Sequence, residues 1–389
     1  MTTPALEIGP DSDLCAAIRA LPEGEELVLQ AGDYRGGCKL RRGGRPGHPL
    51  VIRSADPDHR ARLVYPGYPV NLLEIHAGDI TIRDLDFWGS RGEVDGVRIM
   101  AGNRITVEDC RFLELGGIAI ASTHTSVRGL TVRGNVIQDS GSTGMYFGCH
   151  NGASCAVTGL LVERNYIRGV TAGPTEIGYG IEVKLNSAGV IRDNRIVDTK
   201  GPGIMVYGSQ DVTLVSLIER NFVRGSRTSS GIVVGGGPAI VRNNIAGWNF
   251  EAGIGLEDYH RRGLLRGIAL VHNTVYDNGQ AGISAPETGL LQVTVLNNAI
   301  HGRSGTPATP RPRVGVRLGG NVDCTWAACF TNPDGLDFSA APGSLLQSPR
   351  AMRGEDIPGD DFFGSRRGVL PTLGAVERPQ GPVQLSVQP

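Results

Sequence analysis

Residues 273–283 read Asn-Thr-Val-Tyr-Asp-Asn-Gly-Gln-Ala-Gly-Ile and contain the two markers that decide the fold. The first marker is Asn, any residue, then Ile or Val. It recurs at intervals of 30, 29, 27, 22, 30 and 25 residues, as Asn135-Val136-Ile137, Asn165-Tyr166-Ile167, Asn194-Arg195-Ile196, Asn221-Phe222-Val223, Asn243-Asn244-Ile245, Asn273-Thr274-Val275 and Asn298-Ala299-Ile300. The second marker is a Gly that opens a short apolar strand, in phase with the first, as in Gly253-Ile254 and Gly282-Ile283. Self-similarity at such a period is typical of a solenoid, a propeller or an array.

The segments between the markers have β character. They are short, rich in β-branched residues and bounded by turn residues, as in Leu160-Leu161-Val162-Glu163 and Val212-Thr213-Leu214-Val215. One repeat has room for two or three strands and none for a helix of usual length, which excludes helical solenoids. A propeller blade needs four strands in about 40–45 residues, and most repeats here are shorter. We therefore predict an all-β fold, a single-stranded right-handed parallel β-helix of about 10 coils.

The recurring Asn has a physical role in such a coil. Asn tolerates the left-handed backbone conformation at a turn, and stacked amides can bond one another along the column. We predict that the seven Asn form a structural ladder inside the solenoid. Cys110 lies 25 residues before Asn135 in the same phase and is expected to extend the ladder as a buried thiol, with Leu85 one coil earlier.

The chain has 389 residues, 57 of them Gly, and a formal net charge of −1. This small charge gives no reason to expect a nucleic-acid partner. No apolar run approaches the length of a transmembrane helix, so we expect no membrane partner. A solenoid grows without the core-size limit of a sphere. We predict a monomer with one β-helix domain over residues 1–330 and an irregular C-terminal cover over 331–389, loose after about 378.

The N-terminal end of a solenoid needs a cap, because an open coil exposes apolar core and unpaired strand. Residues 11–21 have the pattern of a short amphipathic helix. Leu14, Ile18 and Leu21 share one face, and Asp11 or Ser12 is the expected N-cap. We predict that this short helix covers the first coil.

Seven cysteines bear on the compartment of the protein. Six of them form three local pairs: Cys15 with Cys38, Cys149 with Cys155, and Cys324 with Cys329. Local pairs are typical of disulfides in an exported protein, whereas reduced thiols are the alternative. The chain begins without a charged-then-apolar leader. This start fits either a cytoplasmic protein or the mature form of an exported one. Because of the cysteine pairs we expect a secreted or periplasmic protein in its mature form, with Cys110 as a free thiol.

Several stretches resemble a known group of proteins. They are residues 22–34 (Pro-Glu-Gly-Glu-Glu-Leu-Val-Leu-Gln-Ala-Gly-Asp-Tyr), residues 46–54 (Pro-Gly-His-Pro-Leu-Val-Ile-Arg-Ser), residues 80–87 and residues 370–377 (Leu-Pro-Thr-Leu-Gly-Ala-Val-Glu). They resemble secreted, pectate-lyase-like right-handed parallel β-helix proteins, which include alginate lyases and chondroitinase B. The resemblance implies the same fold and an action on polysaccharide.

In the lyases of this group, a Lys takes the proton next to a uronate carboxylate and an Arg about one coil on assists. Acidic residues upstream of the Lys often hold calcium. Glu182-Val183-Lys184 resembles the acidic residue and the Lys. The resemblance therefore implies that Lys184 is the base and that Glu182 orients Lys184 or a divalent cation such as calcium. The next coil has Tyr207 in place of Arg, which departs from the family pattern.

Counting along the strands gives candidate residues independently. Side chains alternate along a strand, so the second and fourth residues after each strand-opening Gly are expected to point outward. Most are small or apolar, but three successive coils carry Tyr146, then Glu182 and Lys184, then Tyr207. Further candidates for substrate binding lie beside this row: His124, Asn186, Glu257, Asp258, Tyr259 and His260, with His150 as a candidate for catalysis. The long insertion at residues 168–179 is expected to grip substrate beside them.

We predict a polysaccharide lyase that binds an acidic polysaccharide or oligosaccharide and cleaves it by β-elimination. Lys184 or His150 would take the proton, and Tyr207 or Tyr146 would protonate the leaving oxygen. Other readings of the same residues remain open. Glu182 and Lys184 can form a solvated ion pair, and Tyr146 and Tyr207 a sugar-stacking platform, in a carbohydrate-binding or surface β-helix without turnover.

Two further alternatives concern other chemistry. Glycoside hydrolysis would use Glu182 with Glu257 or Asp258 at a separation of about 5–9.5 Å, and epimerisation is a related possibility in this fold. A transition metal would need the imidazoles of His124, His150 and His260. We assign no residue as a metal ligand.

Overall fold

The computed structural model describes residues 5–151, 154–171, 173, 177–302, 309–325, 328–347, 351–352 and 357–384. These residues form an all-β parallel solenoid of about 12 turns with one short α-helix. The predicted fold class is confirmed, and the number of turns is slightly larger than the expected 10. The chain divides into two compact units, a first unit of residues 1–188 and a second unit of residues 189–388.

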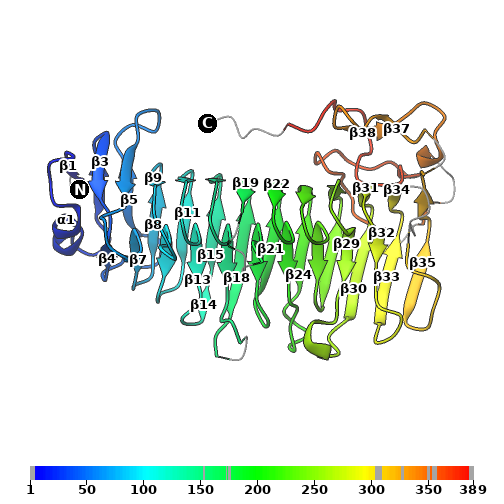
Figure 1. Cartoon of the computed structure of the whole chain (residues 1–389), viewed down its shortest axis with the longest axis horizontal. Coiled ribbons are helices and arrows are strands. Elements are labelled where there is room, and N and C mark those ends of the chain that lie inside the picture. The colour runs from blue at the N-terminus through cyan, green and yellow to red at the C-terminus, as the bar shows by residue number, and fades with distance from the viewer. Residues whose placement is uncertain are drawn as a thin grey trace. The chain divides into compact units, whose positions relative to one another are not determined.

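In the first unit, each coil adds one strand to each of three parallel sheets, A, B and C, which Figure 1 shows as stacked arrows. Sheet A contains β1 (Leu6–Ile8), β2 (Glu26–Leu29), β5 (Leu50–Ser54), β8 (Ile80–Arg83), β11 (Ile105–Glu108), β15 (Leu130–Arg133) and β18 (Val157–Glu163), with β14 (Val127–Arg128) paired to β18. Sheet B contains β3 (Gly32–Arg35), β6 (Ala61–Val64), β9 (Asp86–Trp88), β12 (Arg111–Leu113), β16 (Val136–Gln138) and β19 (Tyr166–Val170). Sheet C contains β4 (Cys38–Leu40), β7 (Leu73–Ile75), β10 (Val97–Ile99), β13 (Ile120–Ser122), β17 (Met145–Phe147) and β20 (Ile181–Val183).

The second unit repeats the same three-sheet arrangement. Its sheet A strands are β21 (Ala188–Arg192), β24 (Ser216–Glu219), β27 (Ala239–Arg242), β30 (Arg266–Val271), β33 (Leu291–Leu296) and β35 (Val316–Gly319). Its sheet B strands are β22 (Arg195–Thr199), β25 (Phe222–Ser226), β28 (Ile245–Gly247), β31 (Thr274–Asn278), β34 (Ala299–Gly302) and β36 (Val322–Asp323). Its sheet C strands are β23 (Ile204–Val206), β26 (Ile232–Val234), β29 (Ala252–Leu256) and β32 (Ala281–Ser284). A 3-10 turn, η1 (Tyr259–Arg261), follows β29.

The Asn ladder forms inside each unit. In the first unit, the Cys110 N–H donates to Asn135 Oδ1 at 3.0 Å, and the N–H and side-chain amide of Asn135 donate to Asn165 Oδ1. Cys110 is buried and free, as predicted. In the second unit the same pair of hydrogen bonds, at 2.8–3.1 Å, links Asn194, Asn221, Asn244, Asn273, Asn298 and Asn321 in turn.

One ladder position differs from the prediction. Asn244, not Asn243, carries the ladder, because Asn243 occupies the left-handed turn position with φ 54° and its side chain points to the C-terminal segment. Both residues are Asn, so the tripeptide rule selected the wrong one. The rule also missed Asn321, which has Asp323 in place of Ile or Val two residues later.

The helix α1 (Leu14–Ala20) is shorter than the predicted 11–21. Its N-cap is Asp13, whose carboxylate accepts the N–H of Ala16 at 2.9 Å, so the assignment of Asp11 or Ser12 was wrong. Leu14 and Ile18 are buried, and the Cys15–Cys38 disulfide joins α1 to β4. The other two predicted disulfides, Cys149–Cys155 and Cys324–Cys329, are also present.

The segment at residues 212–215 was expected to be a strand and is instead a turn and loop. The Asp211 carboxylate accepts hydrogen bonds from the N–H and hydroxyl of Thr213, which turns the chain. Val212 and Val215 are exposed, and the strand begins at Ser216. The β-branched composition of residues 212–215 favoured a strand, but the hydrogen bonds between Asp211 and Thr213 form a turn instead.

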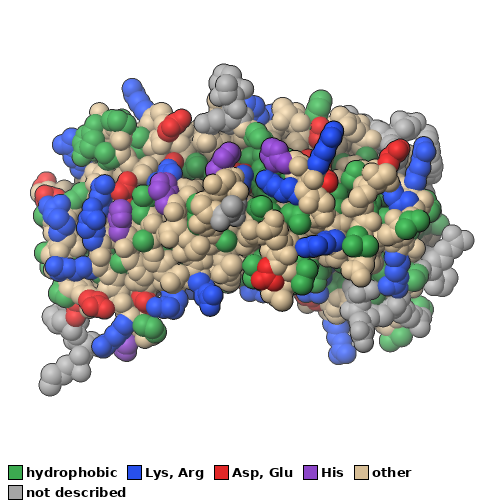
Figure 2. Space-filling model, turned by 90° about the horizontal axis from the view of Figure 1, so that it is seen from below, with side chains coloured by type: hydrophobic (Ala, Val, Ile, Leu, Met, Phe, Trp, Pro, Cys, Tyr) green, Lys and Arg blue, Asp and Glu red, His purple; other side chains and the backbone are tan. Residues whose placement is uncertain are grey.

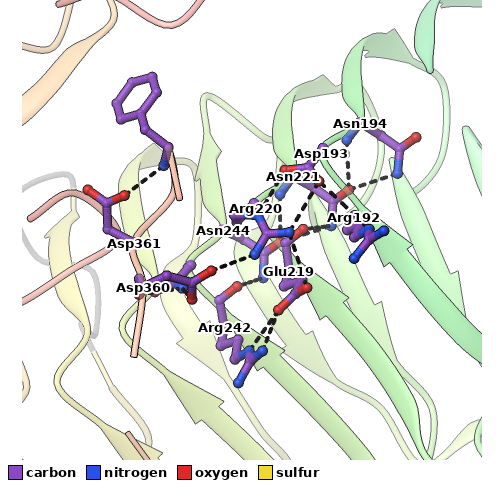
Figure 3. Close-up of polar contacts among 12 residues, drawn as sticks. Arg192, Asp193, Asn194, Glu219, Arg220, Asn221, Arg242, Asn244, Asp360 and Asp361 are labelled. Atoms are coloured by element: carbon purple, nitrogen blue, oxygen red, sulfur yellow. Dashed lines mark hydrogen bonds and ion pairs between the residues drawn. The ribbon is translucent and has the colours of Figure 1, made fainter. Parts of the chain in front are cut away.

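The C-terminal segment docks on the second unit through a polar network (Figure 3). Asp360 accepts from Arg220 Nη1 at 2.8 Å, and Arg220 also pairs with Asp193 at 2.9 Å. Burial acts to lower the pKa of Arg220, but Asp193, Glu219 and Asp360 together raise it above its ordinary value. The buried Arg367 donates to Asn243 Oδ1 at 2.8 Å. These contacts tie the segment to the turns that precede the Asn ladder.

Apolar contacts complete this cover. Phe330 in β37 (Phe330–Asn332) and Phe338 in β38 (Asp337–Ala340) pack edge-on against Tyr276 of β31. The 3-10 turn η2 (Leu345–Gln347) buries Leu346. Val383 is buried and its N–H donates to Leu336 O at 3.0 Å, so the chain stays packed beyond the expected loose end at 378. The domain boundary at residue 330 stays a prediction.

Candidate functional site

The outward row of sheet C carries most of the candidate chemistry in the first unit. Register places one residue of each strand in this row, in the order Lys39, Glu74, Arg98, Ala121, Tyr146 and Glu182. Figure 2 shows histidine side chains among Lys, Arg, Asp and Glu side chains on the face seen from below. The corresponding row of the second unit is Met205, Val233, Gly255 and Ser284.

Counting from Gly117, the strand-opening Gly of the β13 coil, gives Ala119 as the second residue, where Arg98 stands in the coil before, and this count is displaced by two residues. Ala121, not Ala119, pairs with Arg98 and Tyr146, because the turn before β13 extends to Ala119. Several strands of sheet C are only three residues long. The fourth residue after the Gly therefore lies one residue beyond the strand, and this is where Lys184 and Tyr207 are found.

Lys184 and Glu182 form a buried ion pair. The Lys184 Nζ to Glu182 Oε1 distance is 3.0 Å, and the two residues are 5% and 3% exposed. Burial of two charges is costly and occurs where they pair closely or serve a function. The alternative of a solvated ion pair is therefore wrong, since water does not surround this pair.

Tyr146 and His150 meet beside this ion pair. The Tyr146 hydroxyl lies 3.2 Å from His150 Nδ1, and Lys184 Nζ lies 5.4 Å from the centre of the Tyr146 ring. Burial, and then the charge of Glu182, raise the pKa of Tyr146. His150 itself is exposed. We call Tyr146, His150, Glu182 and Lys184 the Lys184 cluster, and the structure brings these four predicted residues together in one unit.

The N-terminal half of the row is also organised by hydrogen bonds. Arg98 Nη1 donates to the buried Asp95 carboxylate at 2.5 Å, and Arg98 Nη2 donates to Thr123 Oγ1 at 3.1 Å. Thr123 Oγ1 in turn lies 3.0 Å from His124 Nδ1. Burial, and then the charge of Arg98, lower the pKa of His124. His124 therefore lies next to Arg98 as a neutral hydrogen-bonding group.

One coil earlier, Glu74 is surrounded by three donors. Lys39 Nζ, His76 Nε2 and Asn71 Nδ2 lie 3.0–3.1 Å from its carboxylate. Burial acts to raise the pKa of Glu74, but these hydrogen bonds outweigh it and the pKa is lowered. The carboxylate is thus held ionised in the same row as Arg98.

Tyr207 lies in the second unit with its own neighbours. It is only 4% exposed, its ring contacts Tyr259 edge-on at 4.9 Å, and the Arg262 guanidinium lies 5.9 Å from its ring centre. A Cβ on Gly236 would lie 2.7 Å from Leu264 Cβ and 3.0 Å from the backbone oxygen of Tyr207, so glycine there permits the close approach of these backbones. A tyrosine buried in this way is not an open platform for a sugar. That Tyr207 faces Lys184 stays a prediction.

The other candidates of the second unit follow β29. The Asp258 carboxylate accepts the N–H of Gly263, and His260 is exposed with φ 57° and packs on Tyr259. Burial, and then the charge of Glu251, raise the pKa of Glu257. Asp258 and His260 therefore have contacts within the second unit, and the pKa of Glu257 is raised by groups of the same unit.

Two predicted parts of the site flank β20: the insertion at 168–179 precedes the strand, and Asn186 follows it. Asn186 occupies the turn after the strand with φ 63°. The insertion at 168–179 includes residues 172 and 174–176, which lie outside the described residues. Its expected role as a grip on substrate stays a prediction.

Comparison with known proteins bears on the fold. Residues 151–325 match the family model of the right-handed β-helix region, and residues 70–215 match that of the periplasmic copper-binding protein NosD. The chain is a right-handed parallel β-helix. No curated protein sequence matches the chain significantly.

Solved structures agree with this β-helix over nearly its whole length. The XylC–xylose complex aligns at a TM-score of 0.63 and 9% identity, covering 97% of this chain and 99% of the other. Pectate lyase Pel9A aligns at 0.61 and 15% identity, covering 97% of both. The Dettilon tailspike protein aligns at 0.56 and 16% identity, covering 81% and 66%. At these identities the likeness shows the fold alone.

The β-helix offers no grouped metal ligands in the part that the structure describes. No three His, Cys, Asp or Glu side chains come together there in a way that could hold a metal ion. Glu182 pairs with Lys184, and the divalent cation implied for it stays a prediction. Among the described residues, no helix has the length and hydropathy of a transmembrane span.

Sequence reasoning missed Glu74, Asp95 and Arg98 as members of the site. The β7 coil lacks the Gly marker before its strand and reads Asn71-Leu72-Leu73-Glu74, so the count never reached Glu74. Arg98 is the second residue after Gly96 and so fell on the counted row, but it was not singled out, and its partner Asp95 precedes the strand. Alignment of the strands by register, rather than by glycine, would have placed Glu74 and Arg98 in one row, whereas Asp95 is found only through its contact with Arg98.

Proposed function

We propose that the chain is a polysaccharide lyase that cleaves an acidic, uronate-containing polysaccharide by β-elimination at the Lys184 cluster. The observation that carries the proposal is the meeting of two pairs: a buried ammonium–carboxylate pair and a tyrosine–histidine pair. β-Elimination starts with loss of a proton beside a carboxylate and ends with protonation of a leaving oxygen. A fixed cation, a base and an acid are the groups that these steps need.

Lys184 suits the role of the cation. Its ammonium donates to the buried Glu182 carboxylate at 3.0 Å, which fixes its position. A fixed ammonium can neutralise the uronate carboxylate and stabilise the negative charge that develops when the neighbouring proton leaves. Glu182 then acts as the group that holds Lys184 in place.

His150 suits the role of the base, and Tyr146 that of the acid. His150 is exposed and can reach a bound substrate, and an imidazole nitrogen can accept a proton as a general base. The raised pKa of Tyr146 keeps its hydroxyl protonated until the leaving oxygen takes the proton. We favour Tyr146 over Tyr207 because the Tyr207 ring is buried against Tyr259.

The bonds and protons balance in this scheme. The C–H electron pair becomes the new carbon–carbon double bond, its proton passes to His150, and the glycosidic C–O pair leaves with the oxygen. Tyr146 protonates that oxygen. The 3.2 Å contact between the Tyr146 hydroxyl and His150 Nδ1 is a direct route for returning the proton from His150 to Tyr146.

The alternative functions have weaker support. Hydrolysis by Glu182 with Glu257 or Asp258 needs free carboxylates, whereas Glu182 pairs with Lys184 and Asp258 accepts the N–H of Gly263. Copper binding, which the name of one matching family suggests, lacks grouped ligands among the described residues. A binding protein without turnover would use the same row of side chains, and the test below separates it from a lyase.

The compartment we propose is outside the cytoplasm. Three disulfides and a match to a periplasmic family fit an exported protein. A polysaccharide substrate is consistent with that location.

The test is to incubate the protein with a panel of uronate polymers and to follow the ultraviolet absorbance of the unsaturated product. We expect absorbance to rise with at least one polymer, and Tyr146→Phe and His150→Ala to lower the rate about 100-fold or more. Tyr68→Phe and His59→Ala, at exposed positions outside the cluster, are the matched controls. Binding without any absorbance change would favour the binding protein.

A further inference from the structure

Arg98 has an unusual position in the outward row of sheet C. It pairs in register with Ala121, and Ala121 pairs with Tyr146 of the Lys184 cluster. Strands of a sheet are about 4.8 Å apart, so Arg98 and Tyr146 lie two strands, or about 10 Å, apart. The buried Ala121 between them contributes only a methyl group. An extended chain that reaches the cluster along this row would therefore pass Arg98.

The guanidinium of Arg98 is fixed in advance. Asp95 is buried, accepts the N–H of Ile118 at 2.8 Å through Oδ1 and binds Arg98 through Oδ2 at 2.5 Å. Thr123 Oγ1 receives a second hydrogen bond from Arg98. The Asp95 side chain is 3% exposed, whereas that of Arg98 is 25% exposed. The buried acid thus anchors an arginine whose outer part still meets solvent.

Arg98 keeps donors for a further partner. An arginine has five N–H groups, and Arg98 uses two of them, on Asp95 and Thr123. The remaining three have no hydrogen-bond partner within the ranges of the chain that the structure describes. A planar fork of N–H groups matches the two oxygens of a carboxylate, and the neutral His124 next to it can bond a sugar hydroxyl.

We infer that Arg98 binds the carboxylate of a second acidic sugar unit, on the N-terminal side of the Lys184 cluster, and so selects polymers that carry more than one acidic unit. This inference rests on the proposed function for its choice of ligand. Lys184 acts on the unit that is cleaved, and Arg98 holds a neighbouring unit that does not react. Arg98 is therefore a binding and specificity residue.

The test is equilibrium binding of short uronate oligosaccharides and of the same oligosaccharides with methyl-esterified carboxylates. We expect Arg98→Ala to weaken binding of the acidic form about 10- to 100-fold and to leave binding of the ester unchanged. Arg104→Ala is the matched control, because Arg104 forms the same kind of pair with Asp79 at 2.6 and 2.7 Å at the edge of sheet A. It should bind like the parent.

Arg98→Ala leaves the buried Asp95 without its partner and can fail to fold. Arg98→Lys keeps a charge beside Asp95 but loses the planar fork, and we expect it to fold and to lose part of the preference for the acidic form. Where turnover is measurable, the KM for acidic oligosaccharides should rise about 10-fold or more with little change in kcat, as for a contact equal in ground and transition states.

The outcomes separate this inference from the proposed function. A parent protein that prefers acidic oligosaccharides through Arg98 but cleaves none of them upholds the inference and refutes the lyase. A lyase in which Arg98→Ala or Arg98→Lys keeps the parent affinity and KM overturns the inference alone. A parent that binds acid and ester equally also overturns it.

Discussion

The same row of the same kind of sheet is chemically different in the two units. In the first unit, sheet C presents Lys39, Glu74, Arg98, Tyr146 and Glu182. In the second unit it presents Met205, Val233, Gly255 and Ser284. Both rows lie on parallel strands stacked in register, but Met205 and Val233 are buried, whereas Lys39 and Arg98 reach solvent. Partly buried charges cost stability unless they are paired, and their concentration in one unit marks where we expect function.

The strongest way to break this comparison is to remove the buried cation of the first unit. Lys184→Ala should lower turnover on a uronate polymer about 100-fold or more, because the uronate carboxylate loses its neutralising charge. Initial rates with circular dichroism as a check on folding measure this. Lys200→Ala, which removes the same charge elsewhere, is the control. Near-normal turnover in Lys184→Ala would refute the role of Lys184.

A second prediction concerns stability in the second unit. Asn273 Oδ1 accepts the N–H and amide of Asn244, and its own amide donates to Val241 O and Asn298. Asn273→Ala should lower the free energy of unfolding by about 3 kcal/mol, since buried donors and acceptors lose their partners. Urea denaturation measures this, with the exposed Asn103→Ala as control. Turnover of the folded variant should stay within about twofold of the parent; a large loss would mean that chemistry is not confined to the first unit.

A third prediction is a pH dependence that belongs to the second unit. His272 is buried, with Nδ1 3.2 Å from Gly374 O and Nε2 2.9 Å from Asn297 Nδ2. Burial, and then the charge of Arg367, lower its pKa well below the ordinary 6.5. Below pH 6.5, His272 therefore binds a proton in the unfolded chain but not in the folded chain. The free energy of unfolding falls as the pH drops from 6.5 towards the pKa of His272 in the folded chain.

His272→Gln removes this proton uptake, so its loss of stability between pH 6.5 and lower pH should be smaller than that of the parent. Thermal unfolding across this range measures the difference, and His59→Gln, at an exposed position, is the control. Parallel pH profiles for the parent and His272→Gln would contradict the prediction.

The smallest expected effect is in the outward row of the second unit. Ser284→Ala changes a partly buried hydroxyl that pairs in register with Gly255. We expect turnover and KM to change less than about twofold, within the usual range for a substitution away from a functional feature. Steady-state kinetics on the best polymer measure both. A larger change would extend the functional face into the second unit.

Most of the fold could be predicted from the sequence because a solenoid repeats its constraints. Each coil needs a tight turn and a partner for its buried amide, so Asn and Gly recur in phase. The three disulfides followed from local pairing. The ladder residue was assigned wrongly where two adjacent Asn, Asn243 and Asn244, could both fill the position. The outward residue of β13 was assigned wrongly because the turn before Ala121 is longer than in the other coils.

The site was less predictable than the fold because it depends on side-chain contacts, and the regular spacing of Asn and Gly along the sequence does not indicate which side chains touch. Tyr146, Glu182 and Lys184 came from the row and His150 from beside it, and their contacts are in the structure. The burial of Tyr207 depends on its ring contact with Tyr259, which lies two coils later in the sequence. Asp95 reaches Arg98 from outside the strand, so only register and geometry reveal the pair.

The central claim is that the chain cleaves a uronate polymer by elimination, and mass spectrometry of the products tests it most directly. Elimination breaks the glycosidic bond without adding water. We predict fragments whose new non-reducing end lacks the elements of one water molecule relative to a hydrolysis product, and their near absence with Lys184→Ala. Fragments whose summed mass exceeds that of the parent chain by one water molecule would show hydrolysis and contradict elimination. A failure to cleave any uronate polymer would contradict the proposal that the chain is a lyase.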